Sequence, residues 1–293
     1  MDLTSYLLGK EAGGGGGTPT LQSKDVEITE NGQTTVTADS GYDGLSSVAV
    51  TTNVQGGGDL SEYFNDTITS SVTSGKDTLN NLVKKLPDVI YVDNSVTSLV
   101  STFYGLKLNE LPKLIFGANI TIMSDTFSSC SNISSIDTSG FNTSNVTNFY
   151  NLFYNDPILE NIDVSNINVS SGTDFRYMFG YCKNIKSLNT SSWVSQNAQK
   201  TSSMFSGCSL LTSIDLSGFT TPNLTSTSSM FSGCRQLQHI DIRNMTFNSV
   251  TDYSSMFSNV PSNCEIIVKD DTQKTWITSK FSNLTNVKTV AEL

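Results

Sequence analysis

Aspartates recur in this chain at intervals of 26 residues or twice that, and oxygens in such a series could bind a cation or a polar ligand. Asp137, Asp163, Asp215 and Asp241 each follow an isoleucine, and Asn189 fills the remaining place in the series. Paired carboxylates can hydrolyse glycosides, but an internal repeat explains this spacing without catalysis. Two interpretations stay open: the aspartates bond neighbouring serines or backbone, or they line a polar groove that binds glycan or protein, with or without Ca²⁺.

The chain offers little for acid–base chemistry. His239 is its single histidine, which removes most schemes built on imidazole, and we find no Walker-type glycine loop, no Gly-x-Ser-x-Gly and no His-Glu-x-x-His motif. We therefore expect no enzyme, and no cofactor other than Ca²⁺. Binding specificity would be encoded where the last regular repeat departs from its neighbours, at His239, Arg243 and Arg235. The predicted ligand-binding residues are Asp137, Asp163, Asp215, His239, Asp241 and Arg243.

Four of the five cysteines occupy the same place in the repeat: Cys130, Cys182, Cys208 and Cys234. Stacked repeats would bring neighbouring thiols to about 5 Å from each other, a separation that disulfide geometry allows. The same place also holds Asp156 and Val260, however, and cysteine is among the most buried residue types. We therefore predict reduced, buried thiols. Zinc is not expected, because 26 residues separate the thiols and the histidine lies elsewhere in the repeat.

A phenylalanine marks the repeat most clearly. It occurs at Phe127, Phe153, Phe179, Phe205, Phe231 and Phe257, always 26 residues apart, and Phe103 precedes the series by 24. Other apolar residues keep the same spacing, and the phrase TSSMFSGC occurs at 201–208 and again at 227–234. A single coil of this kind cannot bury its apolar edge alone, so the coils must stack and present the same residues at the same places.

Each repeat combines two kinds of segment. Residues 161–165, 213–217 and 239–243 alternate polar and apolar side chains, which predicts half-buried strands. Residues 202–211 place apolar side chains three apart, which favours a short helix or 3₁₀ turn. The pattern of one strand and one helical turn per repeat, with leucine or isoleucine at fixed places, is typical of leucine-rich repeats.

The chain after the last repeat predicts a cap that covers the open end of the core. We expect a strand over 265–268, a closing helix over 271–281 and a last strand over 286–290. Trp276, Ile277 and Phe281 would point inward from that helix.

Four tyrosines cluster near the predicted helical edge of the third and fourth coils: Tyr150, Tyr154, Tyr177 and Tyr181. Aromatic residues are frequent at interfaces, and they also pack in cores. Both interpretations stay open for these side chains.

The phrase MFSGCSLLTSIDLSGF closely resembles the BspA-like leucine-rich repeats of bacterial and phage surface proteins, over roughly residues 95–293. The resemblance implies a right-handed α/β leucine-rich repeat solenoid of 26-residue coils, with a parallel β-sheet on one face. In these terms residues 59–263 form the solenoid with its N-terminal cap, and residues 264–293 form the C-terminal cap.

Two glycine runs divide the preceding chain into a predicted docking peptide (1–12), a glycine linker (13–17), a small all-β module (18–54) and a second linker (55–58). Leu3, Tyr6 and Leu7 would form one apolar stripe on a short helix in the docking peptide. The peptide, the glycine run and the β module together resemble the N-termini of tail and head fibre proteins of phages that infect gut Firmicutes. The resemblance implies that residues 1–54 attach a distal module to other virion proteins, with a homo-oligomer, most simply a trimer.

The charge balance excludes some partners. A net charge of −10 argues against nucleic acid and against an anionic membrane surface. We find neither a transmembrane stretch nor the basic, apolar start of a signal peptide. The expected protein is a phage tail or head fibre on the virion surface, extracellular after host lysis, whose repeats bind a host cell-surface glycan or protein. The alternatives are a bacterial surface adhesin with the same repeat and a purely structural capsid or tail decoration protein.

Overall fold

The computed structural model describes residues 27–28, 34–35, 48–50, 89–92, 96–106, 109–111 and 113–293. The predicted docking peptide with Leu3, Tyr6 and Leu7, both glycine linkers and most of the predicted module 18–54 lie outside the described residues. Within that module, β1 (Glu27–Ile28) and β2 (Thr34–Thr35) pair in antiparallel fashion.

The third strand of the predicted N-terminal module joins a sheet with later parts of the chain. Strand β3 (Val48–Val50) pairs in parallel with β4 (Val89–Val92), and β4 pairs in parallel with β5 (Lys113–Phe116). The predicted boundary at residue 54 therefore falls within the chain that connects two neighbouring strands of one sheet.

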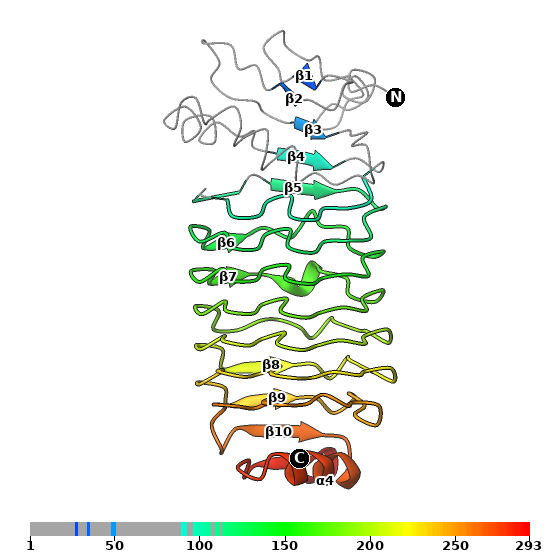
Figure 1. Ribbon diagram of the computed structural model, residues 1–293, viewed down its shortest axis with the longest axis vertical. Helices are drawn as coiled ribbons and strands as arrows, with labels where there is room; N and C mark the ends of the chain where they lie inside the picture. The colour runs from blue at the N-terminus through cyan, green and yellow to red at the C-terminus, as the bar shows by residue number, and fades with distance from the viewer. Residues whose placement is uncertain are drawn as a thin grey trace.

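Residues 113–293 form a stack of coils along the long axis of Figure 1. Short parallel strands line one side of this stack. They are β6 (Ser135–Ile136), β7 (Asn161–Ile162), β8 (Ser213–Asp215), β9 (His239–Asp241), β10 (Glu265–Val268) and β11 (Val287–Thr289). Their register advances by one repeat at each step, as in the series Ser213, His239 and Glu265. This side of the stack is the strand face.

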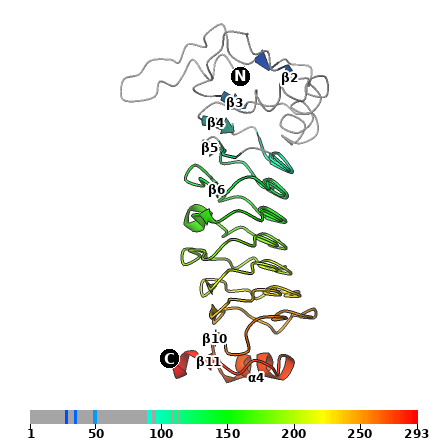
Figure 2. The same ribbon diagram turned by 90° about the vertical axis from the view of Figure 1, so that its left-hand side faces the viewer.

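A second column of parallel bridges runs along a different side of the coils. It joins Ser98, Ile122, Asn148, Asp174, Lys200, Ser226 and Asp252 in turn. The chain folds tightly after each of these residues, and the resulting narrow loops are stacked one above another in the side view of Figure 2. We call the loops that follow this column the turn edge.

The turn edge consists of consecutive β-turns, so the prediction of a helical turn over 202–211 was wrong. The N–H groups of Ser203, Phe205 and Gly207 donate to carbonyls of the next coil at 2.7–2.9 Å. The N–H groups between them donate three residues back, as from Met204 to Thr201. Every second amide is thus committed to the neighbouring coil, and this alternation cannot occur in a continuous helix.

The core is organised around the repeated phenylalanine. From Phe103 to Phe257 the seven rings stack on one another with centroids 5.2–5.9 Å apart and planes within 24°. Each ring is almost completely buried. Stacked aromatic pairs contribute about 0.5–1.5 kcal/mol beyond burial, so the 26-residue spacing repeats a stabilising contact in every coil.

The C-terminal cap closes this ring column. Helix α4 (Asp271–Lys280) confirms the predicted closing helix, with Ile277 fully buried and Trp276 packed on the core. Phe281 at its end meets Phe257 edge-on at 5.0 Å, which ends the series of parallel rings. Two short 3₁₀ segments complete the described elements, η2 (Val164–Asn166) and η3 (Val290–Glu292). Among the described residues, no helix has the length and apolarity needed to cross a bilayer.

Candidate functional site

The aspartates of the strand face are used by the backbone that follows them. Each accepts a hydrogen bond from the N–H two residues later. Ser139 donates to Asp137 at 2.8 Å, Ser165 to Asp163 at 2.9 Å and Ser217 to Asp215 at 2.8 Å. These bonds end the strands, which is why the strands are shorter than the alternating sequence predicts. The bonds from Ser139 and Ser165 also lower the pKa values of Asp137 and Asp163.

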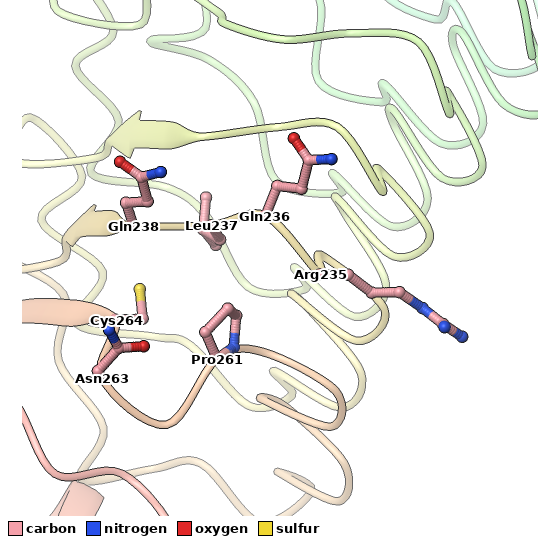
Figure 3. Close-up of a pocket in the computed structure, with 7 residues that line it drawn as sticks. All are labelled: Arg235, Gln236, Leu237, Gln238, Pro261, Asn263 and Cys264. Carbon is pink, nitrogen blue, oxygen red and sulfur yellow. The ribbon is translucent and has the colours of Figure 1, made fainter.

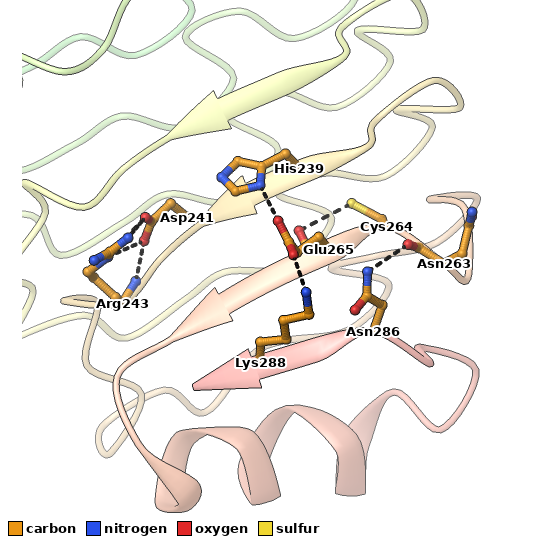
Figure 4. A network of polar contacts seen from close by, with 8 residues as sticks. All are labelled: His239, Asp241, Arg243, Asn263, Cys264, Glu265, Asn286 and Lys288. Atoms are coloured by element: carbon orange, nitrogen blue, oxygen red, sulfur yellow. Dashed lines mark hydrogen bonds and ion pairs between the residues drawn. The ribbon is translucent and has the colours of Figure 1, made fainter. Parts of the chain in front are cut away.

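The structure brings Asp241 and Arg243 together. Asp241 is only 4% exposed, and Arg243 grips its carboxylate through Nε at 2.9 Å and through Nη2 (Figure 4). A bidentate pair of this kind is among the stronger polar contacts in proteins. Asp241 is therefore shielded from solvent by the residue that was predicted to share a binding groove with it.

His239 lies in a separate network on the last strands. Its Nδ1 is 2.8 Å from Glu265 Oε2, and the other carboxylate oxygen accepts a hydrogen bond from Lys288 at 2.6 Å (Figure 4). Hydrogen bonds from Lys288 and His239 lower the pKa of Glu265. The network crosses β9, β10 and β11, so it stabilises the junction between the last regular coil and the cap.

The predicted ligand-binding residues thus form local contacts, three of them in separate coils and three, His239, Asp241 and Arg243, in one coil. Asp137, Asp163 and Asp215 each serve their own turn, while His239 and Arg243 each hold a neighbouring carboxylate. In the described part of the chain, no three His, Cys, Asp or Glu side chains converge as metal ligands would.

A shallow groove of about 490 Å³ lies between the last regular coil and the cap (Figure 3). Its lining includes Gln236, Gln238, Pro261 and Asn263, while Arg235 at its margin points away into solvent. The groove has a sequence cause: Asn263 stands where the preceding coils place leucine or isoleucine. The groove is open, its lining mixes polar and apolar side chains, and it brings no charged pair together.

The cysteines are buried, as predicted, and all are free thiols. Cys182, Cys208 and Cys234 each donate through Sγ to the carbonyl of a phenylalanine 29 residues earlier, at 2.9–3.1 Å. Burial raises the pKa of Cys234 to about 12. These thiols act as small buried donors that tie each coil to the one before it.

A second polar series was missed in the sequence. Asn148, Asp174 and Asp252 lie on the second bridge column, and each accepts the N–H two residues later, at 2.9, 3.1 and 3.3 Å. Their common place, five residues before the repeated phenylalanine, was a usable signal. From this column Arg176 folds back on Asp174, with Nη2 and Oδ2 2.6 Å apart, and its guanidinium lies 5.0 Å from the centre of the Tyr150 ring.

The four clustered tyrosines lie together on the turn edge, and we call this cluster the tyrosine edge. Tyr177 meets Tyr150 and Tyr154 edge-to-face at 6.4 and 5.6 Å, and Tyr154 meets Tyr181 in the same way at 5.6 Å. Tyr181 is 41% exposed, and the other three are half-buried. Tyr181 also covers Gly207 of the next coil, where a Cβ would come within 2.9 Å of its ring. The cluster is therefore ordered by its own contacts and still reaches solvent.

Two of these tyrosines occupy backbone positions that disfavour large side chains. Tyr177 and Tyr181 have φ values of 56° and 62°, in the left-handed region. Every coil needs this conformation at these two places, and the other coils fill them with small or short polar residues. The first place holds Ser101, Asp125, Asn151, Ser203, Ser229 and Ser255, and the second holds Gly105, Ser129, Asn155, Gly207, Gly233 and Asn259. A bulky residue there is a genuine outlier, and such outliers concentrate at functional sites.

Comparison with known proteins identifies the family to which the repeat region belongs. Two matches to one family model, described as Mycoplasma protein of unknown function, DUF285, cover residues 121–239 and 188–291. Together they span more than half of the 293 residues, so the chain belongs to this family. The family is related to the BspA-like repeat proteins. No curated protein matches the chain.

Proposed function

We propose that this chain is a non-enzymatic surface-recognition protein built on a leucine-rich repeat solenoid of the BspA-like type. In the fuller form of the proposal it is a phage tail or head fibre. Residues 1–54 would attach it to other virion proteins, and the stacked coils would engage a glycan or protein on the host cell. The repeat supports this role because stacked coils present side chains at fixed intervals over an extended surface.

The observation that carries the proposal is the tyrosine edge. The fold does not need tyrosine at the places of Tyr177 and Tyr181, since other coils build the same turns with serine, asparagine or glycine. Left-handed backbone at a bulky residue costs about 1 kcal/mol or more at each position. The two tyrosines therefore carry a conformational free-energy cost that the turns themselves do not require. Exposed aromatic side chains of this kind are expected where a protein binds a partner.

Cell binding tests this proposal. The full chain, fluorescently labelled, is applied to a panel of gut Firmicutes strains, with Ca²⁺ and with a chelator. Strain-restricted binding is expected, and the Ca²⁺ arm decides whether the carboxylates take part. Absence of binding across the panel would refute the recognition role and favour a structural decoration protein.

Particle attachment needs its own experiment. A chain that lacks residues 1–12 should fold normally yet fail to enter virions, because the proposed docking stripe of Leu3, Tyr6 and Leu7 is gone. Normal incorporation would contradict the docking role.

A bacterial surface protein is the second candidate, and the family description favours it because that description names a bacterial genus. Immunolabelling separates the two candidates. Antibody raised against the chain would mark purified particles if it is a fibre, and the surface of uninfected cells if it is an adhesin.

A further inference from the structure

We propose that the tyrosine edge binds an uncharged glycan chain, by stacking of sugar rings on Tyr150, Tyr154, Tyr177 and Tyr181. This inference rests on the proposed role in surface recognition and names the ligand class for it. Three features of the edge support it: the arrangement of the rings, the absence of net charge among them, and the small area that they expose.

The ring arrangement suits a ligand with both apolar faces and hydroxyl groups. Tyr177 is perpendicular to Tyr150 and to Tyr154, and Tyr154 is perpendicular to Tyr181. Ring faces and ring edges therefore alternate along the cluster. A sugar ring presents C–H groups on its faces and hydroxyls around its rim, so it can stack on an aromatic face while tyrosine hydroxyls donate and accept at its margin.

Charge at the edge points to an uncharged ligand. Arg176 packs beside the rings, and it is committed to Asp174 through three hydrogen bonds from its side chain, at 2.6–3.1 Å. The pair is locally neutral, and the guanidinium packs on Tyr150. A chain of net charge −10 also repels acidic polymers at long range. Arg176 is therefore not free to pair with an acidic polysaccharide.

The exposed area favours a glycan over a protein partner. Tyr181 is 41% exposed and the other three tyrosines less so, and an aromatic side chain has about 200 Å² of surface. The four rings together therefore offer roughly 300 Å² or less, whereas a stable protein interface buries about 800 Å² on each partner. A row of a few stacked sugar rings matches the smaller area.

The residues of neighbouring coils supply variants that keep the fold. Tyr177→Asn and Tyr181→Asn copy Asn151 and Asn155, which have φ values of 54° and 58° at the equivalent places. The double variant removes two rings and relieves two strained positions, so its melting temperature should equal or exceed that of the parent. Tyr154→Ser copies Ser128 and Ser206 and changes no left-handed position. Val194→Ser, at a side chain 55% exposed outside this edge, is the matched control.

The experiment measures binding of the full chain and these variants to an array of immobilised neutral and acidic bacterial polysaccharides and oligosaccharides. We expect the parent and Val194→Ser to bind one or more neutral glycans. The Tyr177→Asn/Tyr181→Asn variant should bind about tenfold more weakly, the change that two ordinary stacking contacts represent, and Tyr154→Ser should weaken binding in the same direction.

Three results would overturn the inference: no neutral glycan bound by the parent, preference for acidic glycans, or parental affinity in both variants. Cells treated with periodate or with protease separate this inference from the broader proposal. Binding that survives periodate but not protease would identify a protein receptor, so recognition would stand while the glycan assignment fails. Binding to neutral glycans without binding to any cell would support the glycan assignment and contradict the broader proposal of cell-surface recognition.

Discussion

Asp156 is the residue whose replacement should change stability most informatively. It occupies the place of the cysteine column, is 1% exposed and receives the Cys130 N–H on Oδ1 at 2.7 Å. Its other oxygen has no hydrogen-bond partner among the described residues. Burial raises the pKa of Asp156 from 3.8 to about 8. At neutral pH the carboxyl group is therefore mainly protonated, and its O–H is a donor.

The cysteines at this place in other coils bond differently. Cys182, Cys208 and Cys234 donate to a phenylalanine carbonyl 29 residues earlier, whereas Oδ2 of Asp156 has no hydrogen-bond partner among the described residues. A protonated carboxyl group thus takes the place of the thiol in this coil without making the bond that the thiols make. Ionisation removes the proton and leaves a buried charge with a single hydrogen-bond donor, the Cys130 N–H, which is strongly unfavourable.

The sign of the pH effect follows from the raised pKa. Between the unfolded pKa of 3.8 and the folded pKa of about 8, the native state holds a proton that the unfolded chain releases. Stability from this group is therefore complete below the unfolded value and falls as pH rises through the folded value, with a slope of about 1.4 kcal/mol per pH unit. The free energy of unfolding should drop by about 3 kcal/mol between pH 5 and pH 7.

Urea unfolding at a series of pH values measures this slope in the parent and in Asp156→Asn. Asparagine keeps the acceptor for Cys130, offers an N–H donor in place of the O–H and does not titrate in this range. The variant should lose the slope, and Asp156→Cys, which restores the column, should lose it as well. The m-values need to agree among the three proteins, because stacked repeats can unfold in parts. Parallel pH profiles for parent and variants would refute the argument, since the carboxylate would then be hydrated and ordinary.

Other substitutions test the remaining contacts. Phe205→Ala breaks the ring column between two coils and should cost about 3–5 kcal/mol, measured by urea unfolding; a loss below 1 kcal/mol would mean that the neighbouring rings close the gap. Gly218→Ala places a Cβ 1.9 Å from the Trp193 carbonyl oxygen, so a lower melting temperature and a loss of about 1–3 kcal/mol are expected, and unchanged stability would contradict this close packing. Arg243→Ala leaves the buried Asp241 without its partner and should cost about 2 kcal/mol, discounted because Arg243 is partly exposed; parental stability of Arg243→Lys would show that the bidentate geometry is unimportant.

The stacking of the coils was predictable because the repeated residues are the ones that the core needs. Phe127 and the phenylalanines that follow it recur every 26 residues because each coil places its ring on the ring of the coil before it. The closing helix was predictable because Ile277 and its apolar neighbours have helical spacing after the last repeat. These features depend on burial, which a hydrophobic pattern records directly.

The prediction of a helical turn at the turn edge was wrong because the same sequence pattern is compatible with two backbone conformations. Apolar residues three apart, such as Phe205, Cys208 and Leu211, suit a 3₁₀ turn and also a series of β-turns. The hydrogen-bond partners decide between them, and those lie in the next coil. The sequence did contain a signal for turns. Ser203 and Gly207 stand at the two places in the coil that need positive φ, and both residue types tolerate positive φ in turns.

The candidate site was only partly predictable. The tyrosine cluster follows from the repeat register, but the strain at Tyr177 and Tyr181 is visible only in the backbone. The partner of Arg243 could have been inferred, because Asp241 ends β9 and an aspartate there accepts the N–H two residues later, which places Arg243 beside it. The burial of Asp241 could not have been inferred from the sequence, because it depends on how the Arg243 side chain folds over the carboxylate.

A buried acid and two strained tyrosines occur in two adjoining coils of the described chain. Asp156 and Tyr154 belong to the coil of Phe153, and Tyr177 and Tyr181 belong to the coil of Phe179. The coils that follow carry the phrase TSSMFSGC, with serine and glycine at the left-handed places and cysteine in the core. The stability of a repeat protein is close to the sum of the intrinsic stabilities of its coils and the interaction energies between neighbouring coils. Regular coils on one side can therefore stabilise two coils that are less stable by themselves. The strained, exposed tyrosines lie in the same two coils as this buried acid, and our proposal that the tyrosine edge binds a ligand gives these two coils a reason to keep features that the regular coils lack.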